Sequence, residues 1–431
     1  MTSRSRHPRR MPSLVYANQH GEIKDFPELE MAGRSGSHYL RPDPLDLIPL
    51  PEGSELFVLP GRKPVGFEPG SDEPSLLADN PHDPDEEIQA VAAFMAPAHT
   101  AVHTAAFVKN VDAQTLPLFA YTAVGWHDGR FWVSGFRSDN DLRQEPQGFA
   151  IDKIRARTQK RLHALPHNRL VQHLGICSLT YSCPAAKNYF LDRFEAPLPT
   201  SPECNARCLG CISLQPSGCC PSTQDRIRFI PTPAEIAEVA VPHLQRVKKG
   251  VVSFGQGCEG EPLLQADTIE KAIRLIRRQT ANGTVNLNSN ASLPGAVARL
   301  ADAGLDSIRV SMNSARAEYH HRYYRPKGFT FGEVRQSMAE MKKRGRFVSL
   351  NYFILPGFTD EPAEFAALCE LVEAEKPDFI QLRNLNMDPD WYLEAVQQNA
   401  GENPMGIRQW LTELKTRFPA LRFGYYNPPL R

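Results

Sequence analysis

The chain has 431 residues, which is more than one ordinary hydrophobic core needs and predicts two domains. Its 49 Lys and Arg residues balance 49 Asp and Glu residues, so the formal net charge is zero, which argues against a broad nucleic-acid-binding surface. The most apolar run, 90–108, consists mainly of small residues and is interrupted by proline and histidine, which excludes a membrane span. The arginines of residues 1–10 precede no apolar segment, so this stretch is interpreted as a disordered basic tail, with Met11 as an alternative start.

Residues 11–165 are rich in proline and glycine and predict a smaller α+β domain whose role the sequence does not reveal. The runs 118–125 and 130–136 flank Asp128-Gly129, a dipeptide typical of a β-hairpin turn. Residues 85–95 are expected to be helical, because two glutamates would occupy the first turn.

A basic stretch, 151–165, predicts a helix. A solvated helix surface is favoured over a nucleic-acid face, because the acidic residues that balance it are distributed elsewhere in the chain. The next segment, 166–195, contains Cys177 and Cys183 and is expected to link the two domains.

Beyond residue 231, strands alternate with helices of about 10 to 15 residues, which predicts βα units around a parallel sheet. The expected strands are 251–254, 284–288, 307–312, 347–355 and 378–382, and the expected helices are 233–247, 266–278, 294–303, 331–344 and 362–375. A short strand before Cys204 brings the expected number of strands to six. In such sheets the chemistry lies at the carboxyl ends of the strands.

Three cysteines, Cys204, Cys208 and Cys211, follow that first strand with the spacing C-x3-C-x2-C. Structural zinc sites usually supply four ligands, and no fourth is obvious here. Three thiolates on one loop can hold a cluster of four irons and leave one iron open for a substrate or cofactor.

This spacing resembles the signature of the radical S-adenosylmethionine (radical SAM) superfamily, and the resemblance extends from about Ala196 to the end of the chain. It implies a partial (β/α)6 TIM-like barrel over 196–431. It also implies a 4Fe-4S cluster whose open iron is chelated by S-adenosylmethionine, and reductive cleavage to a 5′-deoxyadenosyl radical that abstracts hydrogen from an unidentified substrate. The family often has an aromatic residue where this chain has Gly210. A flavodoxin- or ferredoxin-like electron donor is expected from the family, and a cytoplasmic location from the cysteines.

A glycine-rich stretch, 255–262, follows the second expected strand and resembles the family's Gly-Gly-Glu-Pro motif. It has Glu259 where the first glycine of the motif would be, while Gly260, Glu261 and Pro262 keep the matching positions. The resemblance implies that these three residues bind the cofactor, with Glu261 at the ammonium of its methionyl part. An ordinary strand-to-helix turn is the alternative interpretation.

Polar residues also lie at the ends of later strands. Amide and hydroxyl groups suit a zwitterionic amino acid or a ribose, so Asn288, Ser311 and Asn313 are predicted to contact the cofactor, with Arg309 as a weaker candidate that could instead be paired structurally. Turn formation is the alternative for Asn288. The loop 354–360 resembles the family's late loop against which adenine packs, and Gln381, Arg383 and Asn384 are candidates to face the substrate.

All cysteines except Cys369 fall between Cys177 and Cys258, a pattern that indicates metal binding in a reducing compartment. An auxiliary cluster could use Cys177, Cys183, Cys219 and Cys220; unliganded cysteines are the favoured alternative. For His320, His321 and the neighbouring Tyr319, Tyr323 and Tyr324, a polar surface helix or loop is favoured over a radical relay.

Three other functions stay open at this stage. An activating enzyme that acts on a glycine of a partner protein would co-purify with that partner. A zinc or iron–sulfur binding module without chemistry would not respond to S-adenosylmethionine. An RNA-modifying enzyme would need a basic platform, for which only 151–165 offers support.

Overall fold

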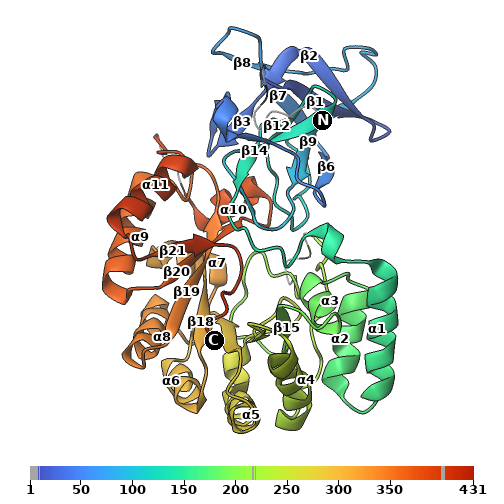
Figure 1. The fold of residues 1–431 in the computed structure, drawn as a ribbon. Helices are drawn as coiled ribbons and strands as arrows, with labels where there is room; N and C mark the ends of the chain where they lie inside the picture. Colours follow the sequence, from blue (N-terminus) through green and yellow to red (C-terminus); the bar gives the residue numbers. More distant parts are fainter. Residues whose placement is uncertain (1–7, 9, 216–217, 219, 399–402) are drawn as a thin grey trace. The chain divides into compact units, whose positions relative to one another are not determined.

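The computed structural model describes residues 8, 10–215, 218, 220–398 and 403–431 (Figure 1). The chain divides into two compact units, each built from several stretches of sequence. The first, called the β unit here, comprises Met1–Asn140, Phe353–Cys369 and Leu382–Pro419. The second, called the barrel unit, comprises Asp141–Tyr352, Glu370–Gln381 and Ala420–Arg431.

Antiparallel strands dominate the β unit. In the described part of the chain, eleven strands form one sheet, and β3, β4 and β11 form a second. The strands are β1 (Ser13–Asn18), β2 (Ile23–Met31), β3 (Gly33–Ser35), β4 (His38–Leu40), β5 (Leu47–Pro49), β6 (Glu55–Leu59), β7 (Arg62–Phe67), β8 (Pro74–Leu76), β9 (Ile88–Phe94), β10 (His99–Ala101), β11 (Thr104–Ala105), β12 (Phe107–Lys109), β13 (Val124–His127) and β14 (Arg130–Arg137). Short 3-10 helices occupy Pro44–Asp46 and, just beyond this unit, Pro146–Gly148.

The predicted hairpin is confirmed: β13 and β14 pair antiparallel, and both Asp128 and Gly129 have positive φ, as the turn requires. The predicted helix over 85–95 is wrong. That segment contains β9, which pairs with β1 and β6 and buries Ile88, Ala90 and most of the residues after them. Pairing with two neighbouring strands outweighs the helical preference of the alanines and glutamates.

A buried ion pair joins β7 of the β unit to the late segment of that unit. Arg62 Nη2 lies 2.7 Å from Asp388 Oδ2, and both side chains are fully buried. Asp388 Oδ2 also accepts a hydrogen bond from the Leu116 backbone N–H at 3.0 Å, and its other oxygen accepts one from the Asp390 N–H at the start of α10 (Pro389–Val396). This single carboxylate therefore connects three stretches of chain within one unit.

A parallel sheet forms the core of the barrel. In the described residues it contains seven strands in sequence order, so the half-barrel prediction is confirmed and the count of six strands is wrong by one. The strands are β15 (Glu195–Pro197), β16 (Val251–Phe254), β17 (Thr284–Ser289), β18 (Ser307–Met312), β19 (Phe347–Ile354), β20 (Phe379–Asn384) and β21 (Arg422–Gly424). The strand that pattern reasoning missed, β21, has three residues, which is too few to show a period.

Helices flank this sheet, and their sequences explain where they begin (Figure 1). Thr232 caps α4 through a capping box with Glu235, and Pro233 occupies its first position. The helices of the chain are α1 (Ile151–Ala164), α2 (Arg169–Leu179), α3 (Pro184–Phe190), α4 (Pro233–Arg246), α5 (Ala266–Gln279), α6 (Pro294–Ala303), α7 (Ala317–Tyr324), α8 (Phe331–Lys343), α9 (Pro362–Glu375), α10 and α11 (Ile407–Arg417), with a 3-10 turn η3 at Pro262–Gln265.

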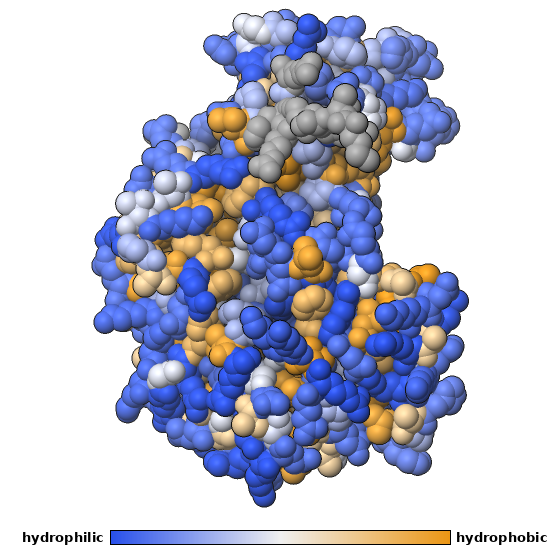
Figure 2. Space-filling view, in the orientation of Figure 1, coloured by the Kyte–Doolittle hydropathy of each residue, from blue (hydrophilic) through white to orange (hydrophobic). Residues whose placement is uncertain are grey.

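No helix in the described part of the chain is both long and apolar enough to cross a membrane. On the face drawn in Figure 2, hydrophilic residues predominate and hydrophobic residues form small groups between them. The composition of the sequence is consistent with a hydrophilic surface, since charged residues make up 23% of it.

Candidate functional site

The three predicted cluster ligands lie on the loop that follows β15, at the carboxyl end of the first barrel strand. Cys204, Cys208 and Cys211 are all partly exposed and form no disulfide. Burial raises the pKa of Cys204 to about 11 and raises that of Cys208 well above its usual value. A metal that binds here must therefore displace protons from these thiols.

Helix α7 holds the cysteine loop by its main chain. The backbone N–H of Arg207 donates to the carbonyl of Tyr324 at 2.9 Å, and that of Leu209 donates to the carbonyl of Tyr323 at 3.0 Å. These bonds flank Cys208 on both sides, so they fix the path of the loop at its central cysteine.

The prediction of a polar surface helix or loop for the His and Tyr residues after β18 holds for His321, which is exposed, and is wrong for the other four. They lie on α7, and Tyr319, His320, Tyr323 and Tyr324 are 8%, 1%, 4% and 4% exposed. The His320 ring packs 4.5 Å from the Tyr324 ring between centroids. Their polar atoms favoured a surface position in the sequence, but their rings form a buried aromatic face that supports the cysteine loop.

The glycine loop after β16 runs against the residues that precede Cys204. Gly260 N–H donates to the Ser201 carbonyl at 2.7 Å, and Glu261 N–H donates to the Glu203 carbonyl at 2.8 Å. A Cβ atom on Gly260 would lie 1.9 Å from the Glu203 carbonyl oxygen. Only glycine permits this approach, which explains the residue at that position of the motif.

Glu261 connects the glycine loop to the end of β17. Its Oε1 accepts hydrogen bonds from Ser289 Oγ at 2.6 Å and from Leu263 N–H at 3.0 Å, and its Oε2 accepts one from Asn290 N–H at 2.8 Å. Burial raises the pKa of this carboxyl to about 7, although the donors around it act in the opposite direction. Three of the roughly four acceptor positions of the carboxylate are thus used within the protein.

Glu259 stands where the family motif has glycine, and like Glu261 it connects two segments of backbone. Its Oε2 accepts from the backbone N–H groups of Thr200 and Ser201 at 2.8 and 2.9 Å, and its Oε1 accepts from that of Gln256 at 2.6 Å. Burial raises the pKa of Glu259 to about 7. A second carboxylate therefore ties the glycine loop to the segment before the cysteines.

The amide-rich end of β17 is a junction between loops. Asn288 Nδ2 donates to the Gly255 carbonyl at 2.8 Å, and Asn290 Nδ2 donates to Asn205 Oδ1 at 2.8 Å, next to Cys204. A Cβ atom on Gly255 would lie 1.7 Å from the Asn288 carbonyl oxygen, and this glycine has positive φ. The structure therefore brings the cysteine loop, the glycine loop and this strand end together.

The predicted residues of β18 are placed less uniformly. Ser311 is partly exposed, whereas Asn313 is fully buried and donates through Nδ2 to the Tyr319 carbonyl at 3.1 Å. Arg309 donates to the amide oxygen of Gln381 at 3.1 Å. Pro262 is buried at the first position of η3, directly after Glu261.

Sequence reasoning missed a polar network that crosses the sheet. Asn427, from the C-terminal tail, donates to Glu195 Oε1 at 2.8 Å and accepts from Gln381 Nε2 at 2.9 Å. Asn286 on β17 donates to Ser253 Oγ at 3.1 Å, and Ser253 in turn donates to Glu195. Asn427 follows β21 in irregular chain, so no pattern in the sequence could have indicated it.

The auxiliary-cluster prediction is only partly represented in the structure. Cys219 lies outside the described residues. Cys177 and Cys183 pack in one small cluster with Cys258, which the sequence had placed only in the glycine loop. The hydrogen bond from Cys258, assisted by His173, lowers the pKa of Cys177.

The loop 354–360, predicted to pack against adenine, belongs entirely to the β unit. Within that unit the Pro356 carbonyl accepts from Gly36 N–H at 3.0 Å. Asp360 accepts from Gly357 N–H at 2.6 Å and from Gly406 N–H at 2.9 Å. These contacts order the loop without a ligand, and its role toward adenine stays a prediction.

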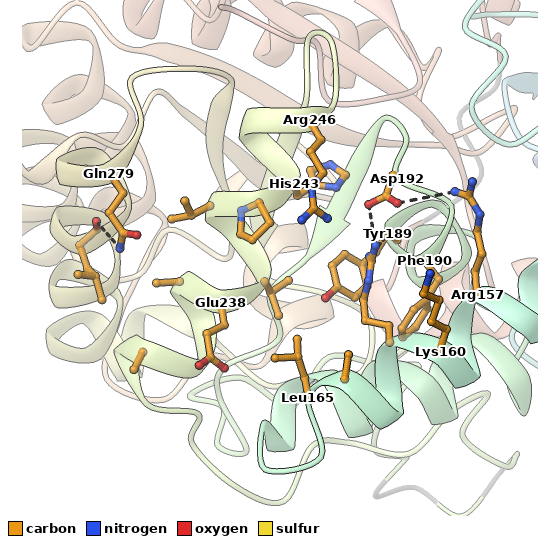
Figure 3. A pocket seen from close by; sticks show the side chains of 18 residues that line it. Arg157, Lys160, Leu165, Tyr189, Phe190, Asp192, Glu238, His243, Arg246 and Gln279 are labelled. Carbon is orange, nitrogen blue, oxygen red and sulfur yellow. Dashed lines mark hydrogen bonds and ion pairs between the residues drawn. The ribbon is translucent and has the colours of Figure 1, made fainter.

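A pocket of about 860 Å³ lies among α1, α3, α4 and α5 (Figure 3). In the described part of the chain, none of the predicted site residues lines it. The basic residues Arg157 and Arg161 of α1 reach its edge, where both pair with Asp192, at 3.7 and 2.7 Å. The basic helix is thus partly neutralised by its own unit, and the pocket is separate from the cysteine loop.

His243 lines this pocket and gives the first prediction. Its Nε2 contacts the Phe194 carbonyl at 3.2 Å, and burial lowers its pKa to about 4. Between pH 4 and 6.5 the unfolded state binds more protons than the folded state. The free energy of unfolding therefore has its full value above pH 6.5 and decreases as the pH falls through this window. Relative to His243→Gln, the wild type should lose about 3 kcal/mol of unfolding free energy across that window. Denaturant titrations at several pH values test this; parallel curves for both chains would contradict it.

Arg226 contacts Cys211, a predicted cluster ligand, and was also missed, because it lies in irregular chain after the loop. Its Nη2 is 3.4 Å from Cys211 Sγ, and its Nε donates to Ser213 Oγ at 3.1 Å. A cation at a ligand sulfur favours the reduced, more negative state of a cluster. Arg226→Gln should therefore lower the reduction potential of a cluster bound at these cysteines by roughly 50–100 mV.

A redox titration followed by electron paramagnetic resonance measures this shift. Arg228→Gln is the matched control, since Arg228 is exposed and two residues away. An unchanged potential in the Arg226 variant, or an equal shift in both, would contradict the assignment.

Comparisons with known proteins agree with this geometry. The family model of the Radical SAM superfamily matches residues 198–369, which include the cysteine loop and the glycine loop. The chain is 26% identical over 177 residues to the FeMo cofactor biosynthesis protein NifB of Klebsiella pneumoniae, covering 38% of this chain and 37% of that protein. It is 24% identical over 204 residues to a probable dual-specificity RNA methyltransferase RlmN of Thermotoga petrophila, covering 45% and 56%.

Among solved structures, methylornithine synthase (PylB) matches with 13% identity and a TM-score of 0.39, covering 56% of this chain and 68% of that one. The chain spans 37% and 56% of the lengths of the two sequence relatives. The cysteine spacing, the loop geometry and the family match agree: residues 198–369 are similar to the radical SAM superfamily.

Proposed function

We propose that this chain binds a 4Fe-4S cluster through Cys204, Cys208 and Cys211 and cleaves S-adenosylmethionine reductively. The observation that carries the proposal is the close packing of two loops. Gly260 and Glu261 pair with the backbone of Ser201 and Glu203, directly before the first cysteine. A loop that offers three thiols is thereby held beside a loop that offers carbonyl and carboxylate acceptors.

The donor set fits such a cluster, because three thiolates leave one iron free for a chelating cofactor. Arg226, close to Cys211 Sγ, compensates negative charge at the ligands. A cluster held there would, once reduced, supply the electron for reductive cleavage of the sulfonium carbon–sulfur bond, the chemistry that yields methionine and a 5′-deoxyadenosyl radical. A flavodoxin- or ferredoxin-like protein would supply that electron.

The protein's own residues would position the cofactor. Glu261 retains about one acceptor position, which can receive the ammonium group of the methionyl part. Ser311 is partly exposed on β18 and can bind a ribose hydroxyl. Asn288, Asn313 and Pro262 would act by holding the strand ends and loops in place, since both amide nitrogens donate within the fold and Pro262 is buried. The radical would then abstract a hydrogen atom from a substrate that neither loop identifies.

The test is anaerobic reconstitution with iron and sulfide, followed by dithionite and S-adenosylmethionine. About four irons per chain and the release of 5′-deoxyadenosine are expected. Cys208→Ala should lose both, whereas Cys183→Ala, which changes a cysteine of the α2–α3 region, should retain both. A chain that takes up only zinc and forms no 5′-deoxyadenosine under these conditions would contradict the proposal.

A further inference from the structure

Three side chains outside the cysteine loop converge in the barrel unit. His173 and Cys177 stand four residues apart on α2, which puts them on the same face of the helix, and Cys258 belongs to the glycine loop. His173 Nε2 lies 3.5 Å from Cys258 Sγ and 3.6 Å from Cys177 Sγ. All three ligand atoms lie within 4.8 Å of one another.

These separations fit a tetrahedral ion. With Zn–S of about 2.3 Å and Zn–N of about 2.0 Å, tetrahedral zinc separates a sulfur ligand from a nitrogen ligand by about 3.5 Å. One imidazole and two thiolates form a borderline-soft donor set, which binds zinc in preference to magnesium or calcium. The three atoms could therefore bind one ion with little movement of the chain.

We propose that His173 Nε2, Cys177 Sγ and Cys258 Sγ bind a single Zn²⁺ ion, at a site separate from the cluster cysteines. Cys177 and Cys258 are 2% and 6% exposed, which protects the thiolates, while His173 is only partly buried and leaves the ion an approach. Among the residues that the structure describes, no fourth His, Cys, Asp or Glu joins the group. A solvent molecule completes the coordination.

The ion would cross-link α2 to the glycine loop. Cys258 directly precedes Glu259, whose carboxylate accepts from the backbone N–H groups of Thr200 and Ser201. The carbonyl of Cys258 accepts from Ile227 N–H at 2.8 Å. Binding at Cys258 would thus add a metal bond to a loop that hydrogen bonds already connect to Thr200, Ser201 and Ile227. By holding Cys258, the ion would stabilise the loop that bears Glu261.

The test identifies the bound element, because metal-free thiols that share hydrogen bonds take up no zinc. The full-length chain with its reconstituted cluster is supplied with Zn²⁺ anaerobically, desalted, and analysed for zinc and iron. One zinc per chain is expected, with X-ray absorption at the zinc edge showing about two sulfurs near 2.3 Å and one nitrogen near 2.0 Å. Cys258→Ser and His173→Ala should each lower the zinc content at least about tenfold and leave the iron content unchanged.

Cys183→Ser is the matched control, because Cys183 packs against the group that contains Cys177 and Cys258 but is not one of the three proposed ligands. It should keep its zinc. A second measurement uses Co²⁺ with a chain in which Cys204, Cys208 and Cys211 are all replaced by alanine. There the thiolate-to-cobalt absorption should appear, and it should vanish when Cys177→Ser is added.

Three results would overturn the proposal: no zinc retained by the wild-type chain, equal loss of zinc in the Cys183 and Cys258 variants, or no cobalt spectrum in the triple-alanine chain. Circular dichroism spectra that match the wild type establish that a variant with lost zinc is folded. The outcome is independent of S-adenosylmethionine cleavage, since iron content and 5′-deoxyadenosine report on the other three cysteines.

Discussion

A Gly260→Ala variant should form 5′-deoxyadenosine at least about 100-fold more slowly than the wild type, because a displacement of about 1 Å at a reacting centre has an effect of that size. The added Cβ would lie 1.9 Å from the Glu203 carbonyl oxygen and 2.4 Å from its carbon. Neither is the end of a flexible side chain, so the glycine loop must separate from the segment before Cys204. The measurements are the rate of 5′-deoxyadenosine formation and the iron content per chain.

Gly295→Ala serves as the control for this variant. Gly295 lies in the first turn of α6, where an added Cβ would meet no atom within 4 Å. Alanine there should leave the rate unchanged and stabilise the helix slightly. A Gly260→Ala chain that retains the wild-type rate would show that the contact between the two loops is unnecessary for the chemistry.

Asp388→Ala should destabilise the β unit by about 3–5 kcal/mol. The substitution leaves the fully buried guanidinium of Arg62 without its carboxylate and removes the acceptor of the Leu116 N–H. A buried charge without a partner costs more than the pair contributes. Denaturant unfolding measures the total loss, and hydrogen exchange of β7 and α10 locates it.

Asp72→Ala is the comparison for this prediction. Asp72 is fully exposed and lies 3.6 Å from Arg41, so its loss should change stability by less than about 0.5 kcal/mol. Equal stability losses in the Asp72 and Asp388 variants would contradict the importance assigned to the buried pair.

The barrel could be predicted from the sequence because its signals are local. Thr232, Pro233 and Glu235 mark the start of α4 within four residues, and the apolar runs of β16 to β20 are bounded by turns. The β unit was less predictable. In the segment 85–95, alanine and glutamate favour a helix locally, and only pairing with β1 and β6, distant in sequence, makes residues 88–94 the strand β9. The three-residue β21 likewise depends on β20 for its existence.

In the candidate site, too, residues in local motifs could be predicted and residues that act through distant contacts could not. The cysteines and Gly260-Glu261-Pro262 are contiguous motifs, so the sequence reveals them. Arg226, Asn427 and His173 act through contacts that span 15, 232 and 85 residues, to Cys211, Glu195 and Cys258, and nothing in their own neighbourhoods signals the contact. Burial is equally invisible in the sequence, as the interior position of His320 on α7 shows.

The most direct test of the central claim is electron paramagnetic resonance of the reduced, reconstituted chain before and after S-adenosylmethionine is added. If Cys204, Cys208 and Cys211 hold a cluster with one open iron, the reduced-cluster signal should be present and should change in shape when the cofactor is added. It should be absent in Cys208→Ala. A signal that is indifferent to S-adenosylmethionine would contradict binding of the cofactor at the cluster, and with it the proposed cleavage.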